Sequence, residues 1–393
     1  MGVVGGGLVG CATAFYLSQA GAKVVLLERG QLNRGASGRN AGSLHFQLEH
    51  RLIQDIDADT EQLEFYVGLA LLAIELWRSI ESDLDTDTQL GMHGGLMIAE
   101  TDAEIELAER KQRIEKSQGL QVELLSGEEA RTLAPYLSHR VRAALHCPDE
   151  GHCNPRLVTL AYASQAQAAG AQIVPGAAVT HLHRNSNEWD IGYSAASSEQ
   201  ATQTVRCTSV LNAAGVWAPQ IARLAHLHLP LYPVALMMSV TERVKPFVGH
   251  LIQHVGRRLS LKQNEDGNVL IGGGWTGRLR EESGNWSPSM EADIQYESLQ
   301  GNLKTATDIV PEVGSLRLLR TWTGSTAITA DQLPVLGEMS EAPGFYVAAG
   351  GSGFTYGPVY AKLMSELMLT GRSTYPITPF SPSRFRGLNA FMA

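Results

Sequence analysis

The chain has 393 residues, of which 44% are hydrophobic and 18% charged, so it is long enough for two domains with sizeable cores. Its net charge of -9 at pH 7 argues against the basic surface that nucleic acids need, and we expect no nucleic-acid partner. No apolar run approaches the about 18 residues that cross a bilayer, so we expect no membrane span.

The first ten residues, MGVVGGGLVG, predict a short strand that runs through a glycine turn into a helix. The spacing Gly5-x-Gly7-x-x-Gly10 lets the backbone turn tightly, approach a pyrophosphate and pack the helix on a sheet. The helix is expected to end at Gly21, and the continuous apolar run that follows is typical of a buried parallel strand. Glu28 ends this strand about 20 residues after the glycines, where an acid binds the ribose hydroxyls of a dinucleotide. Its charge disfavours NADP, so NAD and FAD remain.

The position of the glycine motif and the spread of the cysteines indicate in which cellular compartment the protein is expected. Because the motif begins at residue 5, no room is left for a secretory signal, and we expect a cytoplasmic protein. The usual longer strand before such a turn would need upstream sequence, which leaves a truncated start open. Disulfides are not expected in a reducing compartment. The four cysteines are widely spread, at Cys11, Cys147, Cys153 and Cys207.

The stretch HCPDEGHC at 146–153 places two histidines and two cysteines close together. None of the usual zinc spacings is present, so we interpret it as a strand end and a turn, with no metal site. A zinc site there is the alternative.

Further helices and strands are expected along the rest of the chain. Apolar residues at helical spacing predict helices at 60–83, 102–117, 154–170 and 358–371, with an Asn-Pro capping pair before the third and Pro358 in the first turn of the last. Strands are expected at 172–193, as one apolar strand at 204–215, across a β-rich region at 229–275 with a turn at 264–268, and at 344–354 before a glycine turn. The glycine turns at the start, middle and end, with β-rich sequence between them, predict two interleaved domains.

Three further stretches rich in small residues lie at 34–43 (RGASGRNAGS), 212–219 (NAAGVWAP) and 350–358 (GGSGFTYGP). Small residues allow the backbone to approach a flat, extended cofactor, and a helix N-terminus after the last turn stabilises negative charge on a reduced ring. An NAD-binding domain has no use for the third stretch, so the pattern favours FAD.

In this order, the motifs resemble those of flavoenzymes of the D-amino-acid oxidase superfamily, in the glycine oxidase and sarcosine oxidase branch, over nearly the whole chain. The stretches at 35–47 and 261–274 further resemble the FAD-binding beta subunits of heteromeric opine, D-hydroxyproline or proline dehydrogenases and of multisubunit sarcosine oxidase. The resemblance implies an α/β fold, α+β overall, in which a Rossmann-like FAD-binding domain is interleaved with a β-rich substrate-binding domain. The FAD-binding domain is expected at 1–80, 145–222 and 322–393, and the substrate-binding domain at 81–144 and 223–321.

By the same resemblance the cofactor is FAD, and its contacts come from four parts of the chain. The glycine turn and the end of the second strand supply Gly5, Gly7, Gly10, Glu28 and Arg29. The loop over the flavin ring supplies Ser37, Asn40, Ala41, Gly42, Ser43 and Leu44. The adenine end and the middle of the cofactor are expected to contact Val179, Ala214, Gly215 and Trp217. The pyrimidine edge of the ring is expected to contact Gly351, Ser352, Gly353, Phe354 and Thr355.

The expected substrate site departs from the family pattern at one position. Glycine-oxidase-like members usually carry an arginine that pairs with the substrate carboxylate where this chain has Thr326. Threonine cannot replace bidentate recognition by arginine. Either Arg278, Arg280 or Lys262 takes over this role, or the substrate is bound differently.

Two polar residues follow the flavin loop. His45 and Gln47 alternate in SLHFQ, so both are expected on one face near the ring if this stretch is extended. His45 has the chemistry to accept a proton or to orient an amine. His45, Gln47 and Lys262 are therefore the candidate catalytic residues.

The chemistry implied by the resemblance is transfer of a hydride from the carbon next to an amine nitrogen to flavin N5, which leaves an imine that water hydrolyses. We expect an FAD-dependent dehydrogenase of a small amino acid or secondary amine, opine-, hydroxyproline- or proline-like. It is expected to be the catalytic subunit of a hetero-oligomer, with FMN and an iron–sulfur cluster in or shared with partner subunits. Two alternatives remain, an oxidase that uses oxygen directly and a non-catalytic flavin-binding subunit.

Overall fold

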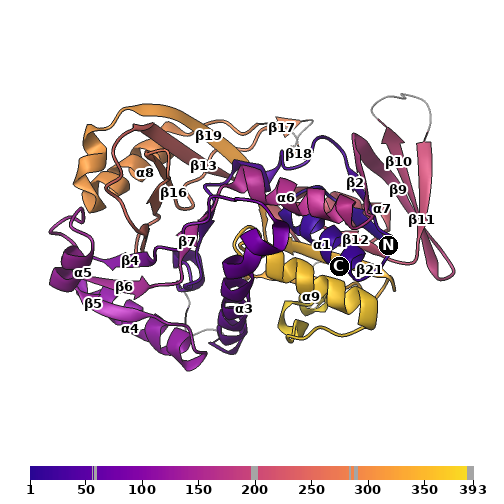
Figure 1. Cartoon of the computed structure of the whole chain (residues 1–393), viewed down its shortest axis with the longest axis horizontal. Coiled ribbons are helices and arrows are strands. Elements are labelled where there is room, and N and C mark those ends of the chain that lie inside the picture. Colours follow the sequence, from indigo (N-terminus) through magenta and orange to yellow (C-terminus); the bar gives the residue numbers. More distant parts are fainter. Residues whose placement is uncertain (55, 57–59, 196–201, 283–284, 287–290, 387–393) are drawn as a thin grey trace.

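Two large sheets form the framework of the structure, a computed structural model that describes residues 1–54, 56, 60–195, 202–282, 285–286 and 291–386 (Figure 1). The first sheet has the strand order β20-β21-β12-β1-β2-β8. All of its neighbouring strands are parallel except the pair β20 and β21. The strands are β1 (Gly2–Val4), β2 (Val25–Glu28), β8 (Gln172–Pro175), β12 (Val210–Asn212), β20 (Pro334–Glu338) and β21 (Phe345–Gly350).

The first sheet is covered on both faces because its strands present alternate residues to two layers. On one face, Val3 and Leu26 pack with the helices α1 (Leu8–Gln19), α6 (Pro155–Ala168) and α9 (Gly357–Thr370). On the other face, Val4 and Leu27 pack with α7 (Ala218–Leu224) and a three-stranded sheet. That sheet comprises β9 (Ala177–Asn185), β10 (Glu188–Ala195) and β11 (Thr202–Cys207). Burial on both faces explains the continuous apolar run before Glu28.

The second sheet has the strand order β19-β13-β16-β15-β14-β4-β6-β5, and only the pair β14 and β4 is parallel. Its core includes Leu96, Leu261 and Ile309, the last from α8 (Tyr296–Ile309). The helices α4 (Asp102–Ser117) and α5 (Gly127–Leu133) contact it at β4, β5 and β6. The strands are β4 (Gly95–Ala99), β5 (Glu123–Ser126), β6 (Ala143–Cys147), β13 (Tyr232–Arg243), β14 (Leu251–His254), β15 (Ser260–Gln263), β16 (Asn268–Gly272) and β19 (Leu318–Ile328).

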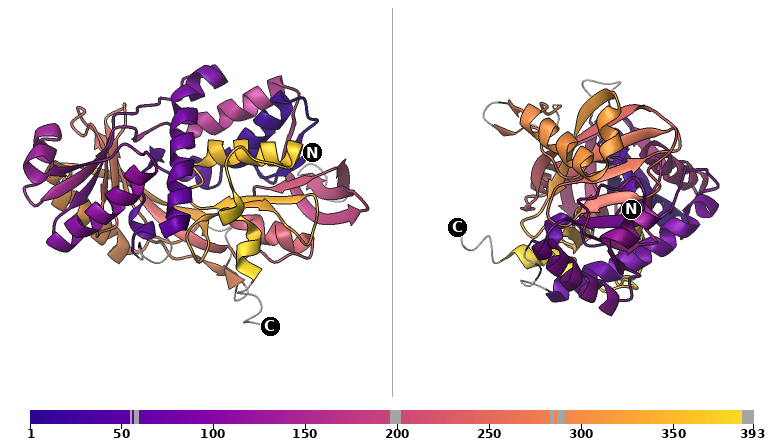
Figure 2. Two further views of the ribbon diagram at one scale, coloured as in Figure 1. Left: turned by 90° about the horizontal axis from the view of Figure 1, so that it is seen from below. Right: turned by 90° about the vertical axis from the view of Figure 1, so that its left-hand side faces the viewer.

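Helix α3 (Thr60–Leu84), 25 residues long, stands between the two sheets in Figures 1 and 2. It packs against α6 and α9 of the first sheet and against α4 of the second. Trp77 of this helix is fully buried, and its Nε1 donates to the carbonyl oxygen of Thr355 at 2.6 Å. Helix α3 therefore connects the two halves of the molecule.

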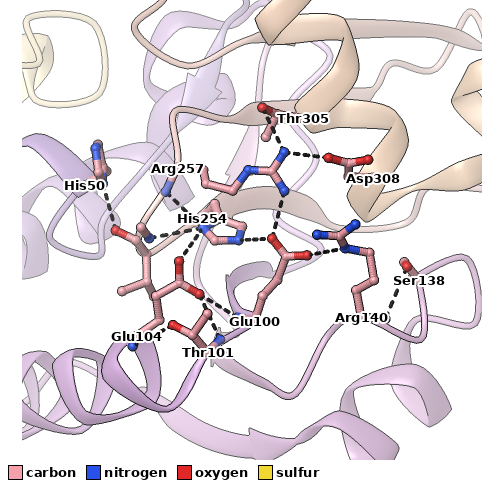
Figure 3. A network of polar contacts seen from close by, with 12 residues as sticks. His50, Glu100, Thr101, Glu104, Ser138, Arg140, His254, Arg257, Thr305 and Asp308 are labelled. Atoms are coloured by element: carbon pink, nitrogen blue, oxygen red, sulfur yellow. Dashed lines mark hydrogen bonds and ion pairs between the residues drawn. The ribbon is translucent and has the colours of Figure 1, made fainter.

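A polar cluster closes one end of the second sheet (Figure 3). Glu100 accepts hydrogen bonds from Arg257 Nη1 at 2.7 Å and from Arg140 Nε at 2.8 Å, and it lies 3.2 Å from His254 Nε2. His254 Nδ1 accepts from the backbone N–H of Arg257 at 3.0 Å, which places the ring proton on Nε2, facing Glu100. His50, from the segment that follows the flavin loop, reaches the adjacent carbonyl of Val255 at 2.7 Å.

The remaining elements are short. They are the helix α2 (Ala36–Arg39), the pair β3 (Ser43–Leu44) and β7 (Gly151–His152), the pair β17 (Glu281–Glu282) and β18 (Asn285–Trp286), and 3₁₀ turns at His50–Leu52, Gly215–Trp217, Pro311–Ser315, Thr378–Phe380 and Pro382–Phe385. Within the described ranges, none of the helices has both the length and the apolar character needed to cross a bilayer.

The helices predicted from apolar spacing are confirmed as α3, α4, α6 and α9. Asn154 caps α6 by accepting from the backbone N–H of Arg156 at 3.0 Å, and α9 ends at Gly371 with φ +74°. The stretch at 146–153 is a strand end and a turn, as expected, between β6 and β7. The first helix ends at Gln19, and its C-cap is Ala20 and not Gly21, which follows with φ +83°.

The prediction of one apolar strand at 204–215 is wrong. The structure divides it into β11 and β12, which belong to different sheets. Cys207, at the end of β11, faces the core between the two layers, and the chain then crosses to the first sheet. An apolar run does not distinguish one strand from two when both are buried.

The strands of each sheet come from separated parts of the chain. Strands β1, β2, β8, β12, β20 and β21 lie within the segments expected to bind FAD. Strands β6 and β19 of the second sheet cross residues 145 and 322, where we expect domain boundaries. The domain bounds therefore stay a prediction.

Candidate active site

The carboxyl ends of four parallel strands converge at one edge of the first sheet. Gly5 follows β1, Glu28 ends β2, Ala214 lies two residues after β12, and Gly351 follows β21. The chain runs from β1 to β2 on one side and returns later as β12 on the other, so this edge is a topological switch point. Ligands of open α/β sheets bind at such a point.

The turn between β1 and α1 brings backbone very close to backbone. Gly5 has φ +116°, and a Cβ added there would lie 2.5 Å from the carbonyl oxygen of Ala213. A Cβ added at Gly10 would overlap the carbonyl oxygen of Gly5. Gly7 is the N-cap of α1 and has no side chain to compete for the first-turn N–H groups, of which Leu8 N donates to Ser37 Oγ at 3.0 Å. The result is a helix N-terminus that a pyrophosphate can approach.

The carboxylate of Glu28 is held beside this turn. Its Oε2 accepts from Gly6 N at 2.7 Å and its Oε1 from Gly30 N at 2.8 Å. A carboxylate offers about four acceptor positions, so it keeps capacity for ribose hydroxyls. The guanidinium of Arg29 lies over the Trp217 ring, 3.9 Å from its centroid.

The loop that carries the expected flavin contacts is ordered by its own side chains. Asn40 Nδ2 donates to the carbonyl of Ser37 at 2.7 Å, and its Oδ1 accepts from Gly42 N at 2.6 Å. Gly42 has φ +73°, and a Cβ there would overlap the carbonyl oxygen of Cys153. Asn40 and Gly42 therefore shape the loop, which leads through Ala41 to Ser43 and Leu44 in β3.

The last glycine turn lies against this loop. Thr355 Oγ1 donates to the carbonyl of Ser43 at 3.3 Å and accepts from His45 N at 3.4 Å. Ser352 Oγ donates to the carboxylate of Glu49 and accepts from Arg51 Nη2 at 3.0 Å. The ring of Phe354, next to Gly353 in this turn, lies 5.8 Å from that of Trp77.

These residues fit FAD. Ser43 Oγ and Trp217 Nε1 are buried and, within the described part of the chain, have no hydrogen-bond partner. At Gly215, with φ +56°, no atom lies within 4 Å of an added Cβ, so the backbone is open to a ligand. Val179 is partly buried and packs against the core that contains Leu27, and its contact with the adenine end stays a prediction.

His45, which directly follows β3, lies close to β15 of the second sheet. His45 Nε2 lies 3.0 Å from the hydroxyl of Ser260 on β15, and Lys262 follows two residues later on the same face of that strand. His45 Nδ1 is buried without a partner among the described residues. Burial is the main cause that lowers the pKa of His45 to about 4; Glu49 acts against this shift, and the charges of Lys262 and Arg51 contribute to it. His45 is therefore neutral at pH 7.

Lys262 is a buried lysine beside this histidine. Only 3% of the residue is exposed, and burial lowers its pKa to about 7. Its Nζ makes no hydrogen bond or ion pair with any described residue. It lines a cleft of about 1190 Å³ between the two sheets, together with Asn40, Ala41, His152 and Trp322. Burial, followed by the charge of Lys262, also lowers the pKa of His152, to about 3.

The other two basic candidates lie elsewhere. Arg278 and Arg280 line a separate pocket of about 640 Å³, where Arg280 pairs with Asp293 at 2.6 Å. Both arginines are exposed. Of the three residues considered as replacements for the arginine missing at Thr326, Lys262 is the one next to His45.

The side chains of Gln47 and His45 contact different parts of the structure. Gln47 is fully buried, and its side chain bridges Lys111 and Glu150. Sequence reasoning missed Ser260, Lys111 and Glu150, because their roles depend on contacts between segments far apart in the chain.

The comparisons with known proteins agree with this geometry. A family described as "DAO: FAD dependent oxidoreductase" matches residues 2–367, so the chain belongs to this family of FAD-dependent oxidoreductases, and FAD is its cofactor. Dimethylglycine dehydrogenase of Homo sapiens is 25% identical over 407 residues, which cover 98% of this chain and 44% of that protein. The beta subunit of sarcosine oxidase of Rhizobium meliloti is 24% identical over 393 residues, which cover 98% of this chain and 87% of that subunit. The chain thus spans less than half the length of mitochondrial relatives such as the first.

Among solved structures, L-proline dehydrogenase from P. horikoshii has the same fold. Its TM-score is 0.84 at 24% identity, and the match covers 98% of this chain and 97% of that one. At this level of identity the likeness supports the fold alone.

Gly10→Ala tests the phosphate-binding turn. The added methyl group would overlap the carbonyl of Gly5, so we expect α1 to shift and the purified protein to lose most of its FAD. The measurement is the ratio of flavin absorbance to protein absorbance after gel filtration. The matched control is Gly249→Ala at an exposed glycine with open space around it, which should keep full flavin content.

Glu28→Ala tests the ribose contact. Loss of an acceptor for buried hydroxyls weakens binding by about 1 to 3 kcal/mol, so we expect a dissociation constant for FAD raised roughly 5- to 150-fold by fluorescence titration. Glu338→Ala is a matched control, because Glu338 also holds a loop amide, Gly344 N at 2.7 Å, in an exposed position. Equal FAD affinity in both variants would contradict the assignment.

Proposed function

We propose that this chain is an FAD-dependent dehydrogenase that oxidises the C–N bond of a small amino acid or secondary amine, opine-, hydroxyproline- or proline-like. When bound, FAD supplies the acceptor for a hydride from the carbon beside the nitrogen, and water hydrolyses the resulting imine. The chain's own residues have three tasks, which are to orient the substrate, to keep its nitrogen neutral and to limit water.

The observation that carries the proposal is a buried lysine without a counter-charge beside a neutral histidine at the flavin loop. A substrate carboxylate would provide the missing counter-charge for Lys262, in place of the arginine that Thr326 replaces. In the tautomer with its proton on Nε2, His45 donates to Ser260 and offers the Nδ1 lone pair to an N–H of the amine. Both contacts favour a substrate that has a carboxylate and an amine close together.

The names of relatives support this substrate class. Dimethylglycine dehydrogenase and sarcosine oxidase are named for N-methylated glycines, in which a carboxylate lies one carbon from the nitrogen. The second is named as a beta subunit, which supports the proposed place of this chain in a hetero-oligomer, whereas its role there as the catalytic subunit stays a proposal. FMN and an iron–sulfur cluster in or shared with partner subunits, and a cytoplasmic location, stay predictions. Among the residues that the structure describes, no group of three or more His, Cys, Asp or Glu is placed to hold a metal ion.

A screen of candidate amines tests the function. Under anaerobic conditions, we expect proline-like, opine-like or N-methylated amino acids to bleach the flavin absorbance of the purified protein. Reduction of an artificial acceptor without hydrogen peroxide in air would identify a dehydrogenase. Hydrogen peroxide release would identify the oxidase alternative, and a flavin that no amine bleaches would indicate the non-catalytic subunit.

Lys262→Met tests the carboxylate contact. The lost charged hydrogen bond should lower kcat/KM about 10- to 100-fold at pH 6 for the best carboxylate-bearing substrate. The ammonium fraction of Lys262 falls as pH rises through about 7, so the ratio of wild type to variant should shrink by pH 9. Because both enzymes act on the same substrate, the ratio of their kcat/KM values at each pH cancels the effect of substrate ionisation.

A stability measurement checks the same residue without substrate. Folding lowers the pKa of Lys262 from 10.5 to about 7, so its charged form destabilises the fold fully below pH 7 and not at all above about 10.5. Lys262→Met should therefore raise Tm, and more at pH 6 than at pH 9. The exposed Lys362→Met on α9 should change neither kcat/KM nor Tm. A ratio of kcat/KM that does not depend on pH would rule out the carboxylate contact.

A further inference from the structure

The backbone N–H groups of residues 45–48 donate to side chains, whereas those of an extended segment usually donate to a neighbouring strand. This segment follows β3 and belongs to no sheet, yet its four consecutive backbone N–H groups all have acceptors. The first donates to Thr355 Oγ1 at 3.4 Å, the second and third to Glu150 Oε1 at 2.9 Å each, and the fourth to Glu115 Oε1 at 2.6 Å. Buried carboxylates thus replace the ladder of a neighbouring strand.

These carboxylates belong to a closed polar network. Lys111 Nζ donates to Glu115 Oε2 at 2.8 Å and to Gln47 Oε1 at 2.9 Å. Gln47 Nε2 donates in turn to Glu150 Oε2 at 3.1 Å. Gln253 Nε2 lies 3.4 Å from Glu150 Oε1. Each of the five residues is at most 4% exposed.

Only one orientation of the Gln47 side-chain amide pairs each hydrogen-bond donor with an acceptor. Its carbonyl oxygen must face the ammonium of Lys111, and its amide nitrogen must face the carboxylate of Glu150. The opposite rotamer would place two donors together at Lys111 and two acceptors together at Glu150. Lys111 and Glu150 therefore fix the orientation of the Gln47 side chain, and this in turn restrains the backbone of residues 45–48.

The network joins parts of the molecule that belong to different sheets. Lys111 and Glu115 lie on α4, and Gln253 lies on β14 of the second sheet. Glu150 lies in the turn between β6 and β7, and β7 pairs with β3 immediately before the segment. Burial raises the pKa of Glu150 to about 7 and also raises that of Glu115, so the fold holds these carboxylates at a cost in free energy. A buried polar network of this kind often contributes no more to stability than apolar packing of the same volume.

We propose that Gln47, Glu150 and Lys111 are positioning residues that hold residues 45–48 and thereby fix His45 at the substrate site. They act through the backbone and touch neither substrate nor cofactor. This assigns to Gln47 a different role from the direct catalytic one expected from its spacing to His45. The kinetic consequence rests on the proposed function, whereas the ordering of the segment does not.

An exchange of two side chains tests the inference. In Glu150→Gln, the new amide nitrogen faces that of Gln47, and in Gln47→Glu two carboxylates face each other. The double variant Gln47→Glu/Glu150→Gln restores the pairing of donors with acceptors, because the new glutamine keeps an oxygen for the two backbone N–H groups and donates to the new glutamate. The glutamate still accepts from Lys111, and the net charge of the network is unchanged.

Hydrogen exchange measured by mass spectrometry is the primary readout, on the FAD-loaded protein. Each single variant should raise amide exchange in the peptide covering 45–48 about 10- to 100-fold, and the double variant should recover most of the protection. The matched control is Glu106→Gln, an exposed position on α4, which should exchange like wild type.

Kinetics is the second readout. Each single variant should lower kcat about 10-fold and change KM less than about 3-fold, with recovery in the double variant. Unchanged exchange and kcat in the single variants, with only Tm reduced, would show that the network merely stabilises the fold. Additive losses in the double variant would also overturn the inference.

Two further outcomes, an inactive wild type and single variants that do not fold, also test the inference. If no amine reduces the wild-type flavin, the proposed function fails, and exchange protection alone decides whether the network orders the segment. If the single variants do not fold, the double variant should fold with wild-type protection, and its failure to do so would contradict the inference.

Discussion

The close approach of α1 to the turn after β1 is the constraint on which the rest of the structure depends. No side chain separates Gly10 from Gly5, or Gly5 from the segment after β12, so helix and strands meet backbone to backbone. This contact aligns the carboxyl ends of β1, β2, β12 and β21 at one edge and leaves a helix N-terminus open there. The later loops, although they come from residues 36–44 and 350–356, are then placed around that edge by the strands that precede or pair with them.

The candidate substrate site depends on how the two sheets meet. His45 follows a short strand attached to the first half of the molecule, whereas Ser260 and Lys262 lie on β15 in the middle of the second sheet. Burial lowers the pKa of both His45 and Lys262, so the site is poor in charge before a ligand enters. Under the proposed function, a carboxylate of the substrate would reach Lys262 and its neutral nitrogen would reach His45.

Polar contacts, in addition to apolar ones, connect the flavin loop to the second sheet. The carboxylates of Glu115 and Glu150 hold the backbone after His45, and His50 reaches the end of β14 beside the cluster around Glu100. Hydrogen bonds fix direction as well as distance, which an apolar contact does not. The backbone that follows His45 is therefore held by Glu115 and Glu150, which are fully buried.

Local signals in the sequence determined much of this protein. The glycine spacing, the acid at Glu28, the helices and their caps, and the order of motifs that resembles one flavoenzyme family follow from backbone sterics and periodicity, which act over a few residues. Only the tertiary structure decided that the run at 204–215 forms two strands in different sheets, that Lys262 rather than Arg278 or Arg280 lies beside His45, and that Gln47 is enclosed by Lys111 and Glu150. Burial and hydrogen-bond partners at these positions arise between segments more than 60 residues apart in the chain, and no local pattern records them.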